Sequence, residues 1–211
     1  MQLVERTDTA HHGTTVWPAG ETLCYFFYAM LQKTPTAVRG KTVLELGAGT
    51  GILSAALGLM GARVTATDMA EPVILDNLRA NIARNATSAT DQNTYAVSVH
   101  AHNWGTVPSD PVLRPSEGTD WDYVVAADCV YTLEPLPLLL ASIDAVAGPK
   151  TVVFVAMERR DPVVSDQCVE RAKALGFDVA KVPRNKLNRA VAHESMEVYK
   201  MKRRPRRQQL E

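Results

Sequence analysis

Three glycines within five residues separate an apolar run from an alanine- and leucine-rich stretch, in the segment Glu45-Leu46-Gly47-Ala48-Gly49-Thr50-Gly51. Glycine lets the backbone turn tightly and approach a ligand closely, because it has no Cβ. A dinucleotide-binding loop would carry a glycine where this chain has Ile52, and a phosphate-binding P-loop would end in Gly-Lys-Ser/Thr. The loop therefore matches neither of these two ligand classes. Glycines in a strand-to-helix turn can also serve packing alone, which is the alternative.

Two acidic residues indicate what such a ligand would contain. Asp68 ends the next strand-like run, seventeen residues after Gly51, where a carboxylate can accept both hydroxyls of a ribose. The alternative is that Asp68 caps the following helix. Glu45 lies in an otherwise apolar strand, and a buried carboxylate is costly without a partner, which a cationic ligand would supply. A ribose, a cation and no pyrophosphate loop together predict S-adenosylmethionine, whose sulfonium and ammonium are both positive.

A second pair of reactive side chains follows the apolar run Tyr123–Ala127. Asp128 and Tyr131 are three residues apart, so a tight turn would let both face one small target. A carboxylate at this place could orient an amine by hydrogen bonding, and a tyrosine ring could offer its π-face to a cationic methylated amine. The alternative is a helix N-cap followed by a tyrosine in the core.

Apolar runs and helical patterns alternate along the whole chain, which predicts one α/β domain with a doubly wound, mostly parallel sheet of seven strands. The expected strands are 41–46, 63–68, 95–101, 123–127, 151–157, 177–182 and 196–201. The expected helices are 21–33, 52–60, 72–85, 133–147 and 161–176. In such sheets the ligand lies beyond the carboxyl ends of the central strands, where the order of the strands reverses. The glycine loop, Asp68 and Asp128 all fall at such ends.

Composition excludes several classes of protein. The chain has 211 residues, 46% of them hydrophobic, with 23 Lys+Arg against 23 Asp+Glu. Zero net charge argues against a globally basic nucleic-acid binder. No apolar run reaches the roughly 18 residues of a membrane span, and no secretory signal is recognisable at the start. Three scattered cysteines predict free thiols, and the five histidines have no metal-site spacing. We therefore expect a cytoplasmic protein that binds neither membrane nor metal.

The charges are unevenly distributed. Six basic residues gather in the last twelve positions, which leaves 17 basic and 22 acidic residues in 1–199, a charge of −5. We predict a single domain over 1–202 and a mobile, solvated tail over 203–211. A nuclear address, or a dock for an acidic partner, is the alternative for this tail. The charged run Met157-Glu158-Arg159-Arg160 is interpreted as a solvated turn, with a place beside the acceptor as its alternative.

The motifs resemble a known family. Glu45–Gly51 followed by Val64-Thr65-Ala66-Thr67-Asp68 is similar to motif I and the acidic post-I residue of the seven-β-strand methyltransferases. Three further motifs resemble the branch that holds the eukaryotic protein-lysine methyltransferases of elongation factors, chaperones and the valosin-containing ATPase. These motifs are Val16-Trp17-Pro18-Ala19-Gly20, Asn103-Trp104-Gly105 and Ala127-Asp128-Cys129-Val130-Tyr131. The resemblance extends from Gly13 to Lys202 and implies a Rossmann-like sheet whose last strand is antiparallel.

The resemblance also implies a role for each motif residue. The backbone of Gly47, Ala48 and Gly49 would hold the methionine part of S-adenosylmethionine, Asp68 its ribose and Trp104 its adenine. Trp17 would cover the methionyl end, and Ala127 would meet the cofactor through its backbone. The N-terminal segment and helix over 1–33 would cover this site. Asp128 and Tyr131 would position the acceptor. Trp104 and Trp17 could instead be a rim packing residue and an anchor for the N-terminal segment.

The activity that follows is transfer of a methyl group to a lysine side chain of a protein, for instance a translation factor or a chaperone, by a monomeric enzyme. The chain lacks the Asn/Asp-Pro-Pro-Tyr turn with which amino-methyltransferases of bases stack a flipped base. Two alternatives stay open. One is a non-lysine or small-molecule amine as acceptor, and the other is a domain that binds the cofactor or a partner without turnover.

Overall fold

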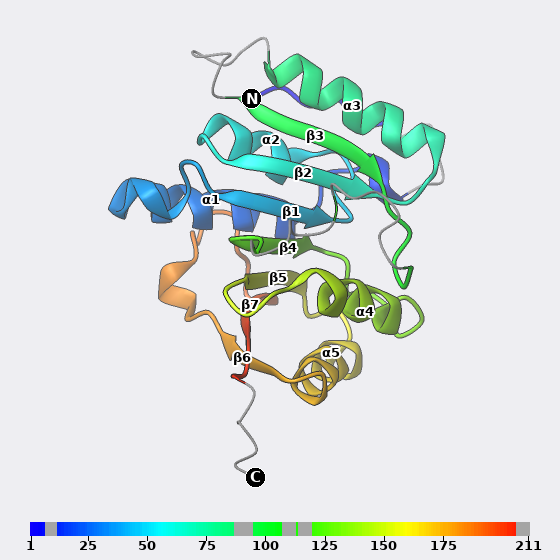
Figure 1. Ribbon diagram of the computed structural model, residues 1–211, viewed down its shortest axis with the longest axis vertical. Helices are drawn as coiled ribbons and strands as arrows, with labels where there is room; N and C mark the ends of the chain where they lie inside the picture. Colours follow the sequence, from blue (N-terminus) through cyan, green and yellow to red (C-terminus); the bar gives the residue numbers. More distant parts are fainter. Residues whose placement is uncertain (7–11, 87–94, 107–112, 114–119, 206–211) are drawn as a thin grey trace.

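The computed structural model describes residues 1–6, 12–86, 95–106, 113 and 120–205, which form one sheet covered by helices on both faces (Figure 1). The strands are β1 (Thr42–Leu46), β2 (Arg63–Asp68), β3 (Ala96–Ala101), β4 (Tyr123–Ala127), β5 (Val152–Glu158), β6 (Phe177–Lys181) and β7 (Met196–Arg203). The α-helices are α1 (Pro18–Lys33), α2 (Ile52–Leu59), α3 (Pro72–Ala86), α4 (Leu136–Val146) and α5 (Pro162–Ala174).

The strand order is β3-β2-β1-β4-β5-β7-β6, and β7 alone is antiparallel to its neighbours. The prediction of a doubly wound, mostly parallel sheet of seven strands with an antiparallel last strand is confirmed. The order reverses between β1 and β4, which are hydrogen-bonded neighbours. A ligand crevice is therefore expected beyond the carboxyl ends of these two strands.

The central strands are buried on both faces because successive side chains point to opposite helix layers. Val124 and Ala126 of β4 pack in one core cluster with α4 and α5, whereas Val125 packs in the other with α1 and α2. A smaller cluster joins α2 and α3 to β2 through Ala55, Ala66 and Leu78. This explains why the central strands are continuous apolar runs in the sequence.

The start of α4 differs from the prediction. The helix begins at Leu136 instead of residue 133, because Pro135 occupies the N-cap position and Pro137 lies in the first turn. The eight residues from Asp128 to Pro135 consequently form a loop above the end of β4. That loop carries both side chains that were expected to face the acceptor.

The other end of the chain also differs. β7 continues to Arg203, whose guanidinium donates to the carbonyl of Ala147 at 2.7 Å and to Oδ1 of Asp144 at 2.8 Å. The first residue of the predicted tail therefore belongs to the sheet. Residues 206–211 lie outside the described residues. Among the helices that the structure describes, none is long and apolar enough to cross a membrane.

The N-terminal residues are tied to α3 by two buried asparagines. The N–H groups of Gln2 and Val4 donate to the side-chain carbonyls of Asn85 and Asn81, each at 2.9 Å. Both amide groups donate back to the same two residues. Asn81 also donates to the carbonyl of Thr50 at 3.0 Å. Asn81 therefore binds both the first residues of the chain and the glycine loop.

Candidate functional site

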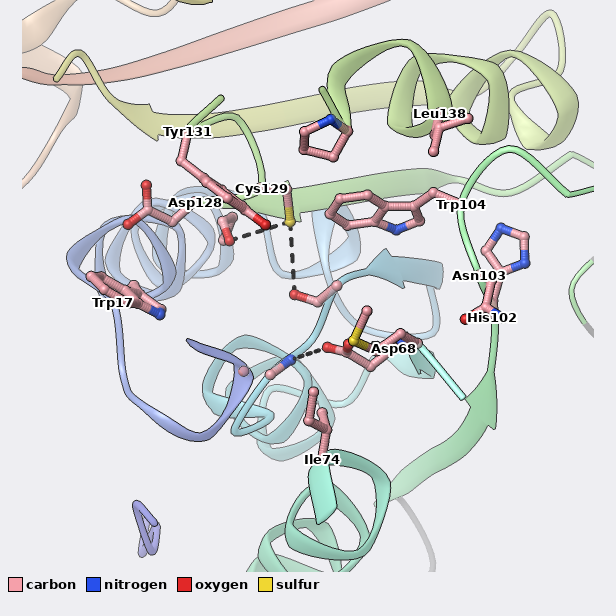
Figure 2. Close-up of a pocket in the computed structure, with 16 residues that line it drawn as sticks. Trp17, Asp68, Ile74, His102, Asn103, Trp104, Asp128, Cys129, Tyr131 and Leu138 are labelled. Carbon is pink, nitrogen blue, oxygen red and sulfur yellow. Dashed lines mark hydrogen bonds between the residues drawn. The ribbon is translucent and has the colours of Figure 1, made fainter. Parts of the chain in front are cut away.

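A cleft of about 490 Å³ opens beyond the carboxyl ends of β1, β2 and β4, a size typical of small-molecule sites. It is lined by Gly13, Trp17, Gly47, Gly49, Asp68, Met69, Ile74, His102, Asn103, Trp104, Ala127, Asp128, Cys129, Tyr131, Pro135 and Leu138. Figure 2 shows Trp17, Asp128 and Tyr131 on one side of this cleft, and Asp68, Asn103 and Trp104 on the other. The predicted site residues line it, apart from Ala48 and Glu45.

The glycine loop forms the floor of the cleft. The N–H groups of Gly47 and Ala48 both donate to the carbonyl of Thr67 at 2.9 Å, which fixes the loop to β2. Gly47 has a φ of 74°, and a Cβ there would lie 2.7 Å from Sγ of Cys129 and 2.8 Å from the Trp104 ring. Ala48 does not line the cleft, because it is buried against α2, α3 and β2.

Asp68 holds the loop from the other side. Its Oδ2 accepts the Gly49 N–H at 2.7 Å, and its Oδ1 accepts the Met69 N–H at 2.8 Å. Burial raises the pKa of Asp68, while these two hydrogen bonds lower it. Each oxygen keeps a second lone pair that can accept a ligand hydroxyl. The N-cap alternative is wrong, because α3 begins only at Pro72.

Glu45 does not line the cleft, which corrects the expectation that a cationic ligand is its partner. The side chain is 2% exposed, and its Oε2 accepts the hydroxyl of Ser54 on α2. Burial raises the pKa of Glu45 to about 8, the charge of Asp68 adds to this, and the Ser54 hydrogen bond opposes it. The buried carboxyl thus has a hydrogen-bond partner within the protein, and its burial favours the protonated form.

The loop after β3 presents Trp104 to the cleft beside Gly47. His102 and the Gly105 N–H both meet the hydroxyl of Ser142 on α4, at 3.1 and 3.0 Å. Burial lowers the pKa of His102, so the ring is held neutral. His102 was considered in the sequence only as a metal ligand, and its position two residues before Trp104 was the available signal for this supporting role.

Asp128 is in the left-handed region with a φ of 56°, and its side chain is 1% exposed. Its Oδ2 accepts Nη2 of Arg160 at 2.8 Å, and its Oδ1 is buried without a hydrogen-bond partner among the described residues. The alternative of a helix N-cap is wrong, because α4 starts eight residues later. Tyr131 is 45% exposed at the cleft, so it is not a core tyrosine either.

Trp17 occupies the N-cap position of α1, where its ring lies under the guanidinium of Arg160 at 5.1 Å. Arg160 was interpreted as part of a solvated turn; its side chain is 39% exposed, and it also pairs with Asp128. Cys129 is a free thiol, as predicted for the cysteines; its buried Sγ lies 3.3 Å from the carbonyl of Leu46, and burial raises its pKa. The cleft thus combines a glycine floor and a carboxylate at one side with a second carboxylate and two aromatic rings at the other.

A family model described as "lysine methyltransferase" matches residues 1–172. The chain belongs to this lysine methyltransferase family. Relatives include the protein-lysine methyltransferase METTL21E of Bos taurus, 35% identical over 76% of this chain and 51% of the relative. The EEF1A lysine methyltransferase 3 of Xenopus tropicalis is 33% identical over 72% of this chain and 63% of the relative. The chain thus spans about half to two thirds of the length of these family members.

Solved structures share the fold at low sequence identity. The CcbJ methyltransferase of Streptomyces caelestis superposes with a TM-score of 0.63 and 16% identity, covering 94% of both chains. The glycopeptide N-methyltransferase MtfA complexed with S-adenosylmethionine has a TM-score of 0.56 and 16% identity, covering 84% of this chain and 87% of that one. The methyltransferase fold and the family that the sequence motifs resemble are both confirmed.

Proposed function

We propose that this chain is an S-adenosylmethionine-dependent N-methyltransferase that acts on a lysine side chain of a protein. The proposal rests mainly on the side chains that line one cleft. A glycine floor with a ribose-compatible carboxylate lies opposite a buried carboxylate oxygen, Oδ1 of Asp128, that has no partner among the described residues. Membership of the lysine methyltransferase family supports the same conclusion.

The residues present fit the cofactor. A Cβ at Gly47 would collide with the side chains of Cys129 and Trp104, so only glycine lets the loop pass this close to the Trp104 ring. The free lone pairs of Asp68 would accept the ribose hydroxyls, and the Trp104 ring would stack on the adenine. Ala48 would contribute by holding the loop in shape. When bound, S-adenosylmethionine supplies an activated methyl group to the site.

On the acceptor side, the protein must present an amine with a free lone pair. A lysine with a pKa of about 10.4 is neutral only about 0.04% of the time at pH 7, and partial desolvation in the cleft would increase that fraction. Asp128 by itself favours the ammonium form, so we assign it to orientation, with Oδ1 accepting an N–H of the amine. Tyr131 would line the entrance and contact the alkyl chain and the amine.

We propose a translation factor as the first substrate to test, because two relatives are named for EEF1A. Incubation of the protein with radiolabelled S-adenosylmethionine and either EEF1A or an extract of its source cells should label a protein band. Acid hydrolysis of that band should yield methyl-lysine. Asp68→Ala is the matched control and should lose the labelling.

Three other results would contradict the proposal in different ways. Label in another amino acid would show that the acceptor is not lysine. Label only in the small-molecule fraction would indicate that the acceptor is a metabolite amine. Cofactor binding in isothermal titration without any label would indicate a binding domain. We also propose that the protein is a monomer, which size-exclusion chromatography would test. We further propose that it is cytoplasmic, which imaging of the tagged protein would test.

A further inference from the structure

Arg160 is the hub of a small ionic cluster next to the cleft. It follows β5 directly and lies between two carboxylates, with Nη2 at 2.8 Å from Oδ2 of Asp128 and Nε at 2.8 Å from Oε2 of Glu158. Its guanidinium carbon is 5.1 Å from the centre of the Trp17 ring. Three segments far apart in the sequence therefore meet on one side chain.

The contact with Arg160 engages only one of the two carboxylate oxygens of Asp128. Asp128 is anchored through its backbone, because its N–H donates to the carbonyl of Ala156 at 2.9 Å. Its side chain could still rotate about the Cα–Cβ and Cβ–Cγ bonds. The guanidinium occupies Oδ2 and leaves Oδ1 buried and unpartnered among the described residues. A buried acceptor atom without a donor is costly unless a ligand supplies one.

The remaining contacts fix Arg160 itself. Glu158 accepts from Nε, on the same edge of the guanidinium as the Nη2 that binds Asp128, and the guanidinium carbon lies over the Trp17 ring. A planar fork that pairs with carboxylates while it stacks on a ring is a property of arginine that lysine lacks. Trp17 is also a predicted cofactor residue at the start of α1.

We propose that Arg160 is a positioning residue, which orients the Asp128 carboxylate so that Oδ1 faces the acceptor amine and which connects this carboxylate to Trp17. The inference rests on the proposed lysine methyltransferase activity and adds a residue to its acceptor side. Arg160 touches neither the methyl group nor the amine in this scheme. It acts through Asp128.

The neighbouring arginine provides a matched control. Arg159 pairs with Asp166 at 2.8 Å and lies 3.6 Å from Glu197, and neither of these carboxylates lines the cleft. Arg159→Ala removes the same side chain one position away. We expect this variant to keep the turnover of the wild type.

The first experiment tests the pair without relying on activity. Urea unfolding of wild type, Asp128→Asn, Arg160→Ala and the double variant gives a double-mutant cycle. If the two side chains interact as described, the unfolding equilibrium constants should show a coupling of about fivefold or more. Independent effects in this cycle would overturn the proposed contact.

The second experiment tests positioning through turnover. With labelled S-adenosylmethionine and a methylated protein identified as above, Arg160→Ala should lower kcat by about tenfold to a hundredfold, as when the partner that orients a functional group is lost. Binding of S-adenosylhomocysteine should change by less than about threefold. Arg160→Lys should have intermediate turnover. The double variant should be no slower than Asp128→Asn alone, because Arg160 acts through Asp128.

The two possible failures are distinguishable. A wild-type protein that methylates no lysine would overturn the proposed function. An active wild type with an equally active Arg160→Ala, or with losses that multiply in the double variant, would overturn the positioning role alone.

Discussion

The buried carboxyl of Glu45 makes the stability of this protein depend on pH in a way that one substitution should remove. Because its pKa is raised from 4.5 to about 8 in the folded state, the fold favours the protonated form. The unfolded chain releases this proton near pH 4.5, and the folded chain keeps it until about pH 8. The contribution of Glu45 to stability is therefore fully present below pH 4.5 and is lost as the pH rises through 8.

The size of the loss follows from the same values. Each pKa unit corresponds to about 1.36 kcal/mol, so between pH 5 and pH 8 the wild type should lose on the order of 4 kcal/mol through this one group. Glu45→Gln keeps an oxygen that can accept the Ser54 hydroxyl and has no proton to release. It should therefore be more stable than the wild type at pH 8, and the difference should disappear toward pH 5.

Urea unfolding of both proteins at pH 5, 6, 7 and 8, without cofactor, would measure this difference. Comparing the two proteins at each pH cancels the titration of all other groups, provided that their m-values agree. If the unfolding free energies of wild type and Glu45→Gln run parallel from pH 5 to pH 8, Glu45 is ionised in the folded state and our reasoning about its burial is wrong.

Three further predictions concern the cleft. Gly47→Ala should weaken S-adenosylhomocysteine binding at least about tenfold in isothermal titration, because a Cβ at a φ of 74° would lie 2.7 Å from Sγ of Cys129 and 2.8 Å from the Trp104 ring, so the loop or the ring must move; unchanged affinity would contradict a role of this loop in the cofactor site. Asp128→Asn should lower kcat by about 10²–10³-fold with little change in cofactor affinity, and Tyr131→Phe should cost less than Tyr131→Ala; a fully active Asp128→Asn would end its assignment. His102, whose pKa burial lowers from 6.5, should contribute stability that is complete above pH 6.5 and declines as the pH falls toward its folded pKa. Thermal unfolding at pH 7.5 and 5 should therefore show a smaller acid loss for His102→Gln than for wild type, and equal losses would refute this.

The sheet could be predicted well from the sequence, because strands buried on both faces read as continuous apolar runs. Val124 and Val125 face different helix layers, and both must be apolar. The start of α4 was less predictable, because Pro135 and Pro137 fit a first turn in more than one register. Asp128 lies in the loop before this helix and caps no helix, so only the alternative interpretation of Asp128 is wrong.

The candidate site was predictable where a short motif carries its own chemistry, as in the glycine loop. The contacts between distant residues were not. Arg160 meets Asp128 across 32 positions, and His102 meets Ser142 across 40. Such pairs depend on how loops from different strands lie at one edge of the sheet. The periodicity of apolar residues in the sequence does not determine this arrangement. Glu45 lies between these cases, since its burial was foreseeable but its partner Ser54 was not.

The position of β7 in the strand order determines when the sheet can be completed during synthesis. β7 lies between β5 and β6, so β6 has no neighbouring strand until β7 is made. At about 5–20 residues per second, the 45 residues from Glu158 to Arg203 take roughly 2–9 seconds. During that interval β5 presents an open edge rich in valine, to which another nascent chain could pair. Substitutions that weaken β7, far from the cleft, should therefore reduce the yield of folded protein more than the turnover of the molecules that do fold.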